Sequence, residues 1–241
     1  MSAGYPEFPT QEDWKRIYSA SRFDQIFSLW DGIQARKGPR TDWSGFTKAM
    51  QLDGLMYEMR ERLVDTARSY VFMMFFYGQG IPDKRWYVSP GNRGQSVQFF
   101  PDFKERHFVI KGWFDFYSDT SYYKLFSAWD LVGHILSVKY DLSPKKGRVN
   151  FKWAVKALTS KNATLRASLE EVRDSPAFQK ANKLRNDISH NYLPYTTGIA
   201  IHRGEGVTGI GFKHYVPSAE IIANIQEALD LFGVTLQRIT A

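Results

Sequence analysis

Residues 175–192 have the sequence SPAFQKANKLRNDISHNY, which combines a helix start, an apolar side and a row of polar groups. Ser175 can cap a helix and Pro176 suits a first helical position, so a helix is predicted to begin there. At 3.6 residues per turn the apolar residues share one side of this helix: Phe178, Ala181, Leu184 and Ile188. The more polar side collects Asn182, Arg185, Asn186, Ser189 and His190. The helix is therefore expected to pack against a core and to present hydrogen-bonding groups on its other side.

Arg185 and His190 suit the cleavage of RNA by internal transfer. In that reaction a base removes the 2′-hydroxyl proton, charge develops on the phosphoryl oxygens, and an acid protonates the leaving 5′-oxygen. A histidine titrates near neutrality and can take one proton role, while a guanidinium can hold the phosphate and stabilise its growing charge. This chemistry demands no metal. The same spacing also arises by chance, as a helix-end histidine beside a surface arginine, so spacing alone does not predict an active site.

The chain is basic, with a net charge of +7, and the excess is concentrated in one segment. Residues 141–190 carry 11 Lys and Arg against five Asp and Glu, which accounts for +6 of the total. An unevenly charged surface would explain this equally well. Because the segment includes Arg185 and His190, we favour an anionic ligand, held by Lys183 and the basic residues of 145–166.

Composition excludes several classes of function. The chain has no cysteine, so disulfides, thiolate metal sites and cysteine nucleophiles are absent. The longest apolar run, residues 70–77, is too short to span a membrane, and the first residues do not resemble a signal peptide. His107, His202 and His214 show no zinc-ligand spacing and are expected on the surface. We therefore expect a cytoplasmic protein without a cofactor, a metal or a membrane contact.

Apolar spacings of three and four predict a mostly helical chain, with core stripes at residues 125, 129, 132 and 136 and at residues 221, 225, 229, 232 and 236. Helices are expected over one or two stretches within residues 10–30, then over residues 43–77, 103–117, 119–139, 150–158, 164–172 and 176–192, and after residue 218. The Gly- and Pro-rich residues 78–102 predict a long loop with an extended piece near 97–100. Alternating residues around Gly204-Glu205-Gly206 predict a β-hairpin.

Arg185-Asn186-Asp187-Ile188-Ser189-His190 resembles the motif of the HEPN superfamily, in which an arginine, a polar residue, three variable residues and a histidine lie near a helix end. Residues 127–134 (SAWDLVGH) and 151–153 (FKW) resemble a bacterial HEPN subfamily in particular. The resemblance covers about residues 119–192. It implies a mainly α fold, a HEPN-like helical bundle with extra N-terminal helices and a small β-hairpin near the C-terminus. We expect a single domain over 1–241, with its core at about 43–192, an N-terminal extension at 10–37, and the hairpin and last helix at 197–240.

The resemblance implies a metal-independent endoribonuclease with a toxin, antiphage or stress-response role. Such proteins are often homodimers in which both motifs face one cleft, and an antitoxin-like protein is a further candidate partner. Arg185 and His190 become the catalytic pair, with Asn186 and Ser189 orienting them and Lys183 holding RNA. Asp130, which can pair with His134 one turn along its helix, is expected to support the site. Other HEPN proteins only bind RNA, a nucleotide or a protein, so a non-catalytic module remains the alternative.

Overall fold

A computed structural model describes residues 7–35, 43–144, 147–191, 193–204 and 207–240, which form a mainly helical structure. The eight α-helices of these residues are α1 Gln11–Ser19, α2 Phe23–Ala35, α3 Trp43–Gly78, α4 Glu105–Lys139, α5 Phe151–Ala157, α6 Ala163–Asp174, α7 Pro176–His190 and α8 Ser218–Thr240. Two small antiparallel sheets pair β1 Tyr87–Val88 with β2 Gln98–Phe99, and β3 Ile199–Gly204 with β4 Val207–Phe212. The expected fold class is confirmed.

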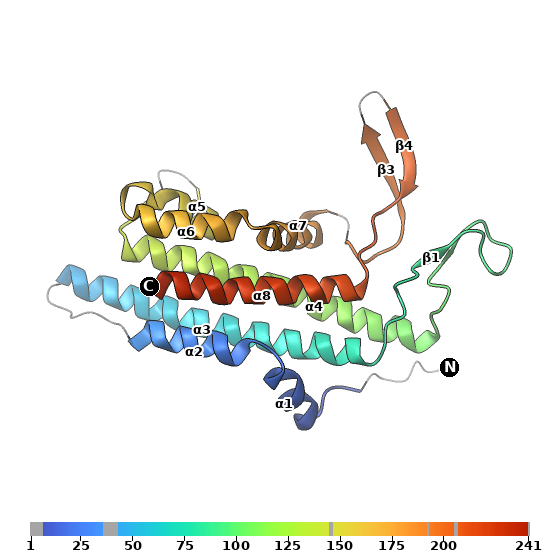
Figure 1. Ribbon diagram of the computed structural model, residues 1–241, viewed down its shortest axis with the longest axis horizontal. Helices are drawn as coiled ribbons and strands as arrows, with labels where there is room; N and C mark the ends of the chain where they lie inside the picture. Colours follow the sequence, from blue (N-terminus) through green and yellow to red (C-terminus); the bar gives the residue numbers. More distant parts are fainter. Residues whose placement is uncertain (1–6, 36–42, 145–146, 192, 205–206, 241) are drawn as a thin grey trace.

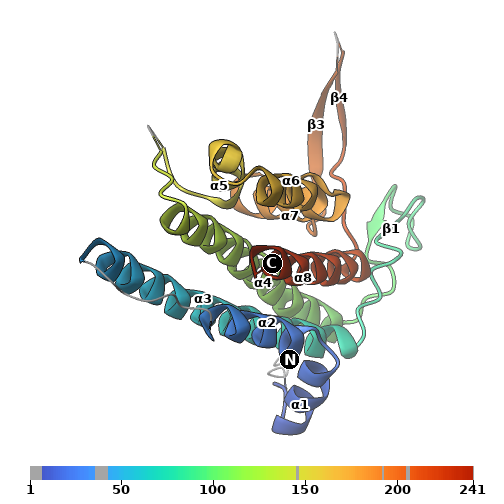
Figure 2. The ribbon, with the colours of Figure 1, turned by 60° about the vertical axis from the view of Figure 1, so that its left-hand side comes forward.

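The two longest helices, α3 and α4, pack side by side, and α8 packs on α4 and on α2, α6 and α7 (Figure 1). Figure 2 shows α5, α6 and α7 on one side of the α4 and α8 pair, with α2 and α3 on the other. The β3–β4 hairpin projects from the end of the bundle where α7 ends and α8 begins (Figure 1). Helix α7, which carries the motif, therefore lies in an outer layer and packs on α4 and α8.

The apolar stripes predicted for α4 and α8 form the centre of the core. Their nine positions are almost completely buried: Leu125, Trp129, Val132 and Leu136 on α4, and Ile221, Ile225, Leu229, Phe232 and Leu236 on α8. Two hydrogen bonds join polar groups inside this core: the Trp129 Nε1–H donates to the Thr235 hydroxyl at 3.1 Å, and the Tyr122 hydroxyl donates to Asn224 at 2.7 Å. One continuous hydrophobic cluster reaches from α1 to α8, so the N-terminal helices pack on the same core as the rest.

Helix α4 is continuous, whereas two helices were predicted over residues 103–117 and 119–139. The prediction of a break was wrong. Polar residues near the junction place their hydroxyls on the carbonyls of the preceding turn: Ser118 on Phe114 at 2.7 Å, and Ser121 on Tyr117 at 2.8 Å. Such bonds give the serine hydroxyls a hydrogen-bond partner within the helix, so the helical backbone hydrogen bonds continue through the polar stretch.

Other boundaries follow the sequence closely. The N-terminal stretch forms two helices, and α7 begins at Pro176 with the Ser175 hydroxyl accepting from the Phe178 N–H at 3.3 Å. The extended piece in residues 78–102 pairs with Tyr87–Val88, so part of the loop is a small hairpin. The backbone of the predicted C-terminal hairpin is confirmed, although its turn at residues 205–206 lies outside the described residues. Within the described chain, none of the helices has a stretch apolar and long enough for a membrane crossing.

His107 is buried, at 8 % exposure, so its prediction as a surface histidine was wrong. Its ring Nδ1 accepts a hydrogen bond from the Lys104 N–H at 3.0 Å and helps to begin α4. Burial and the positive charges of Arg106 and Lys104 lower the pKa of His107. His214 is exposed, as expected, and the side chain of His202 lies outside the described residues.

Candidate functional site

Helix α7 is anchored by its apolar side, as the sequence predicts. Phe178, Ala181 and Leu184 are buried, and the Phe178 ring lies 5.0 Å from the ring of Trp129 and 5.5 Å from that of Phe126 on α4. The polar side of the same helix is consequently turned toward α5 and solvent, where a hollow of about 180 Å³ opens between α4, α5 and α7. The residues that line it are Phe126, Trp129, Asp130, Asn150, Phe151, Lys152, Phe178, Asn182, Arg185 and Asn186.

Arg185 lines this hollow with a guanidinium that has no anionic partner among the described residues. Its Cζ lies 5.2 Å from the centre of the Phe126 ring, which suits a cation over an aromatic face. The Nε–H is buried and has no hydrogen-bond partner in the described part of the chain. A buried donor without an acceptor is costly, so this group is suited to a ligand that supplies one.

Asp130 lies in the same hollow and ties α4 to the start of α5. Its carboxylate accepts the Phe151 N–H at 3.2 Å. The helices approach closely here, because a Cβ at Gly133 would lie 2.6 Å from the Asn150 backbone. Burial raises the pKa of Asp130, and this is partly offset by the Phe151 N–H and by the positive charges of Arg185, His134 and Lys152. Asp130 therefore has a structural contact as well as a place near Arg185.

His190 is the last residue of α7 and is exposed, outside the residues that line the hollow. Ser189 donates its hydroxyl hydrogen to the Arg185 carbonyl at 2.7 Å, so that hydrogen is used within the helix. Lys183 is exposed and does not line the hollow either. The structure thus brings Arg185, Asn186 and Asp130 together and places His190 about one turn farther along, at the solvent.

A model of a HEPN-like domain family matches residues 56–239. The chain belongs to this HEPN family. The match includes α7 with its motif. It also extends through the hairpin into α8, beyond residues 119–192, which the resemblance in sequence covers. No curated protein and no solved structure matches the chain. HEPN domains are commonly ribonucleases, and RNA or a second copy of the domain are their general partners.

The basic segment of this HEPN domain is not uniform in the structure. Arg166 and Arg173 pair with Glu170 at 3.1 and 3.4 Å, whereas Lys156 and Lys161 are exposed to solvent. Lys145 and Lys146 lie outside the described residues. Some of the positive charges in residues 141–190 are therefore neutralised by ion pairs. The charge counted along the sequence is larger than the unpaired positive charge near Arg185.

Asn150 and Lys152 also line the hollow; Asn150 was not predicted, and Lys152 was predicted only as one of the basic residues of 145–166. Asn150 caps α5 by accepting the Trp153 N–H at 2.9 Å, and Lys152 follows two positions later. The FKW segment at 151–153 that resembles a HEPN subfamily was the available signal. No cluster of three or more potential metal ligands occurs in the part of the chain that the structure describes, and metal independence stays a prediction.

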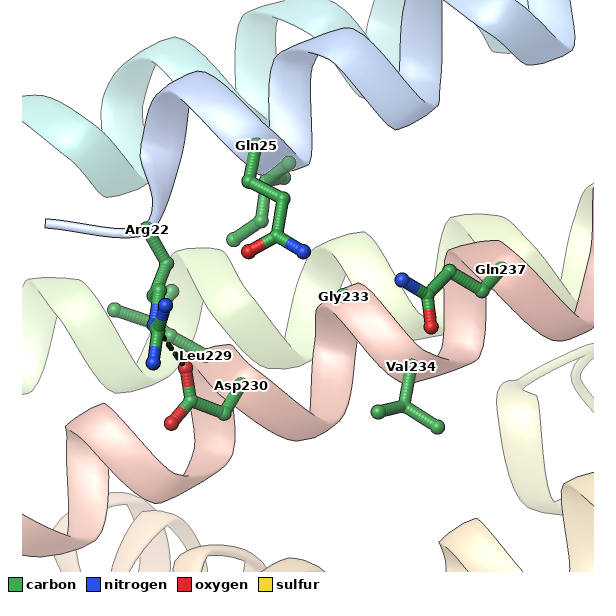
Figure 3. A pocket seen from close by; sticks show the side chains of 8 residues that line it. Arg22, Gln25, Leu229, Asp230, Gly233, Val234 and Gln237 are labelled. Carbon is green, nitrogen blue, oxygen red and sulfur yellow. Dashed lines mark hydrogen bonds and ion pairs between the residues drawn. The ribbon is translucent and has the colours of Figure 1, made fainter.

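A second hollow, of about 230 Å³, lies between α2 and α8 (Figure 3). Its only charged lining residues, Arg22 and Asp230, pair with each other at 2.9 Å. The amides of Gln25 and Gln237 extend into the space between the two helices (Figure 3). Because Arg22 and Asp230 already pair with each other, the described lining of this hollow offers no unpaired charge for a ligand, and the hollow lies apart from α7.

Proposed function

We propose that the protein is a metal-independent endoribonuclease in which Arg185 binds the scissile phosphate and His190 transfers a proton. The observation that supports this most is the state of Arg185, whose guanidinium lines a hollow and forms no ion pair with the described residues. His190 stands five residues farther on the same helix and is exposed, so RNA can reach it. Membership of a family in which ribonucleases are common adds to the proposal.

The cleavage we propose follows internal transfer. A base takes the 2′-hydroxyl proton, the 2′-oxygen forms a bond to phosphorus, and the bond to the 5′-oxygen breaks as an acid protonates that oxygen. His190 takes one proton role, and the fork of donors on Arg185 stabilises the equatorial oxygens. Asn186 shares the hollow and can donate to the ribose or the phosphate. Ser189, Lys183 and Asp130 are proposed as supporting residues, Lys183 through the RNA backbone.

The proposal includes a homodimer, formed in the cytoplasm, in which the motifs of two single-domain chains face one cleft. Two copies of His190 would then supply a base and an acid to the same phosphate. A toxin, antiphage or stress-response role, with an antitoxin-like protein as a further partner, belongs to this proposal. A dimer structure in which the two motif helices point apart into solvent would exclude cooperation between the subunits.

The proposal is tested by incubating purified protein with mixed RNAs in excess chelator. We expect cleavage by the wild type and a loss of about 10²- to 10⁴-fold in rate for His190→Ala, because a positioned proton-transfer group contributes on this scale. His214→Ala is the matched control, since His214 is also exposed but lies outside the motif. No cleavage by the wild type, or equal cleavage by wild type and His190→Ala, would contradict the proposal.

A second candidate function is favoured by one observation: His190 does not line the hollow that contains Arg185. A non-catalytic HEPN module would use the hollow to bind RNA, a nucleotide or a protein without needing a proton-transfer group. Binding that is unaffected by His190→Ala, together with no cleavage of any RNA, would support this alternative.

A further inference from the structure

Two cations from different helices line the motif hollow. Lys152 reaches it from α5 and Arg185 from α7. The Lys152 Nζ lies 5.7 Å from the centre of the Phe178 ring, and the Arg185 Cζ lies 5.2 Å from that of Phe126. The two rings are themselves 5.5 Å apart and form part of one aromatic floor. Both cations thus lie over neighbouring rings at the same opening.

Neither cation is paired with a carboxylate of the described residues. Asp130 is the acidic residue that lines the hollow, and its carboxylate already accepts the Phe151 N–H. With Lys152 and Arg185 positive and Asp130 negative, the lining carries a net charge of +1. Nearby Arg173 does not change this balance, because it pairs with Asp174 at 2.7 Å. The hollow therefore has positive charge in excess of what the chain neutralises.

Lys152 responds to the charges around it. Partial desolvation lowers its pKa, and the positive charges of Arg185 and Arg173 lower it further, against the opposing effects of Asp130 and Asp174. Like charges held near each other repel, and an anion between them would remove that repulsion. The hollow has the room for one, since about 180 Å³ is far more than the roughly 10–15 Å³ that a single water needs.

We propose that Lys152 and Arg185 bind one phosphate of the RNA backbone between them in this hollow. The inference rests on the proposed function for the identity of the ligand, and it concerns binding rather than cleavage. A guanidinium binds two phosphate oxygens in a fork, and an ammonium adds a point charge with rotatable donors. Lys152 is thereby distinguished from the other basic residues of α5 and α6, which do not line the hollow.

The test measures binding in a His190→Ala background with a short single-stranded 2′-O-methyl RNA of random sequence, which cannot undergo internal transfer. We expect Lys152→Gln to weaken binding about tenfold and to lower the slope of log affinity against log salt by about one, measured between about 50 and about 200 mM salt. Lys156→Gln is the matched control, because Lys156 lies one turn farther on α5, is exposed and does not line the hollow. It should change affinity less than about twofold. Lys152→Arg should retain most of the binding.

A double-mutant cycle tests whether the two cations share one phosphate. If they do, Lys152→Gln and Arg185→Gln together should weaken binding by much less than the product of their separate effects. Equal effects of Lys152→Gln and Lys156→Gln, no effect of Lys152→Gln, or strictly multiplicative effects in the double mutant would each overturn the inference. Failure of the proposed function is distinguished by the cleavage assay, since the binding experiment gives its result whether or not RNA is ever cut.

Discussion

Helix α4 carries a cluster of charged residues toward each of its ends, and the two clusters differ in how their charges are matched. The motif hollow contains Lys152 and Arg185 without carboxylate partners in the described chain. At the other end, Lys111 is only 6 % exposed and places its Nζ 2.8 Å from both oxygens of Asp115. The same Nζ lies 5.2 Å from the centre of the Tyr195 ring. Lys111 at one end is thus buried and paired, whereas Lys152 and Arg185 at the other end are more exposed and have no carboxylate partner among the described residues.

The buried cluster joins segments that are far apart in the sequence, and we call it the Lys111 network. It comprises Asp83, Lys111, Asp115, Asp119, Tyr195, Tyr215 and Ser218. Tyr195, which follows the motif helix, donates to Asp119, and Tyr215, which follows the hairpin, donates to Asp83 at 2.7 Å. Asp83 also accepts from the hydroxyl and the N–H of Ser218, at the start of α8. The 78–102 loop therefore contributes a residue that fixes the start of α8.

The difference teaches what each cluster is for. Buried polar groups need hydrogen-bond partners within the fold, and the carboxylates of the Lys111 network accept from Lys111, Tyr195, Tyr215 and Ser218, which gives the network a structural role. The motif hollow is only partly buried, so unmatched cations are tolerated there until a ligand binds. A substitution in the network should mainly change stability, and a substitution in the hollow should mainly change binding and cleavage.

The largest expected effect comes from removing the buried cation. Lys111→Met leaves Asp115 buried without its partner, and loss of one member of a buried pair costs about 3–5 kcal/mol of the free energy of unfolding. Lys152→Met, at the exposed cation, should change it by less than about 0.5 kcal/mol. Urea denaturation of both variants measures the contrast. A Lys152→Met protein as unstable as Lys111→Met would remove the distinction between the clusters.

A smaller effect is expected from Tyr195→Phe, which removes the hydroxyl that donates to Asp119. Hydrogen bonds to charged groups contribute about 1.5–3 kcal/mol, so the free energy of unfolding should fall by that amount. Tyr123→Phe is the control, because Tyr123 lies on α4, as Asp119 does, and is 45 % exposed. Equal denaturation curves for Tyr195→Phe and Tyr123→Phe would show that Tyr195 does not hold the end of the motif helix.

The smallest of these effects is a pH dependence. Burial raises the pKa of Asp115 to about 7, against the opposing effect of Lys111, and the negative charges of Asp119 and Asp83 raise it further. The folded state then holds a proton that the unfolded state releases above about pH 4. The contribution of Asp115 to the free energy of unfolding is therefore greatest at low pH, and it is lost as the pH rises through about 7. Between about pH 6 and pH 8 the loss should be about 1 kcal/mol, and most of it should disappear in Asp115→Asn, where Asp119, whose pKa burial raises to about 6, still titrates. A wild-type slope that Asp115→Asn retains would contradict this assignment.

Sequence patterns predicted those features that depend on neighbours along one helix. The stripes of α4 and α8 were correct because a helix that packs on a core repeats its apolar residues every three or four positions. Features that depend on tertiary contacts were missed. The burial of His107 and the place of Lys152 beside Arg185 arise only when separate helices meet. The continuity of α4 was missed because hydroxyl bonds from Ser118 and Ser121 to the preceding turn compensate a polar run.

The central claim, that Arg185 and His190 form the site of an internal-transfer ribonuclease, is tested most directly by the chemistry of the product ends. RNA incubated with the protein in excess chelator should yield fragments with 2′,3′-cyclic phosphate and 5′-hydroxyl ends, and His190→Ala should yield almost none. Fragments with 5′-phosphate ends, or cyclic phosphate ends produced equally by His190→Ala, would contradict the account.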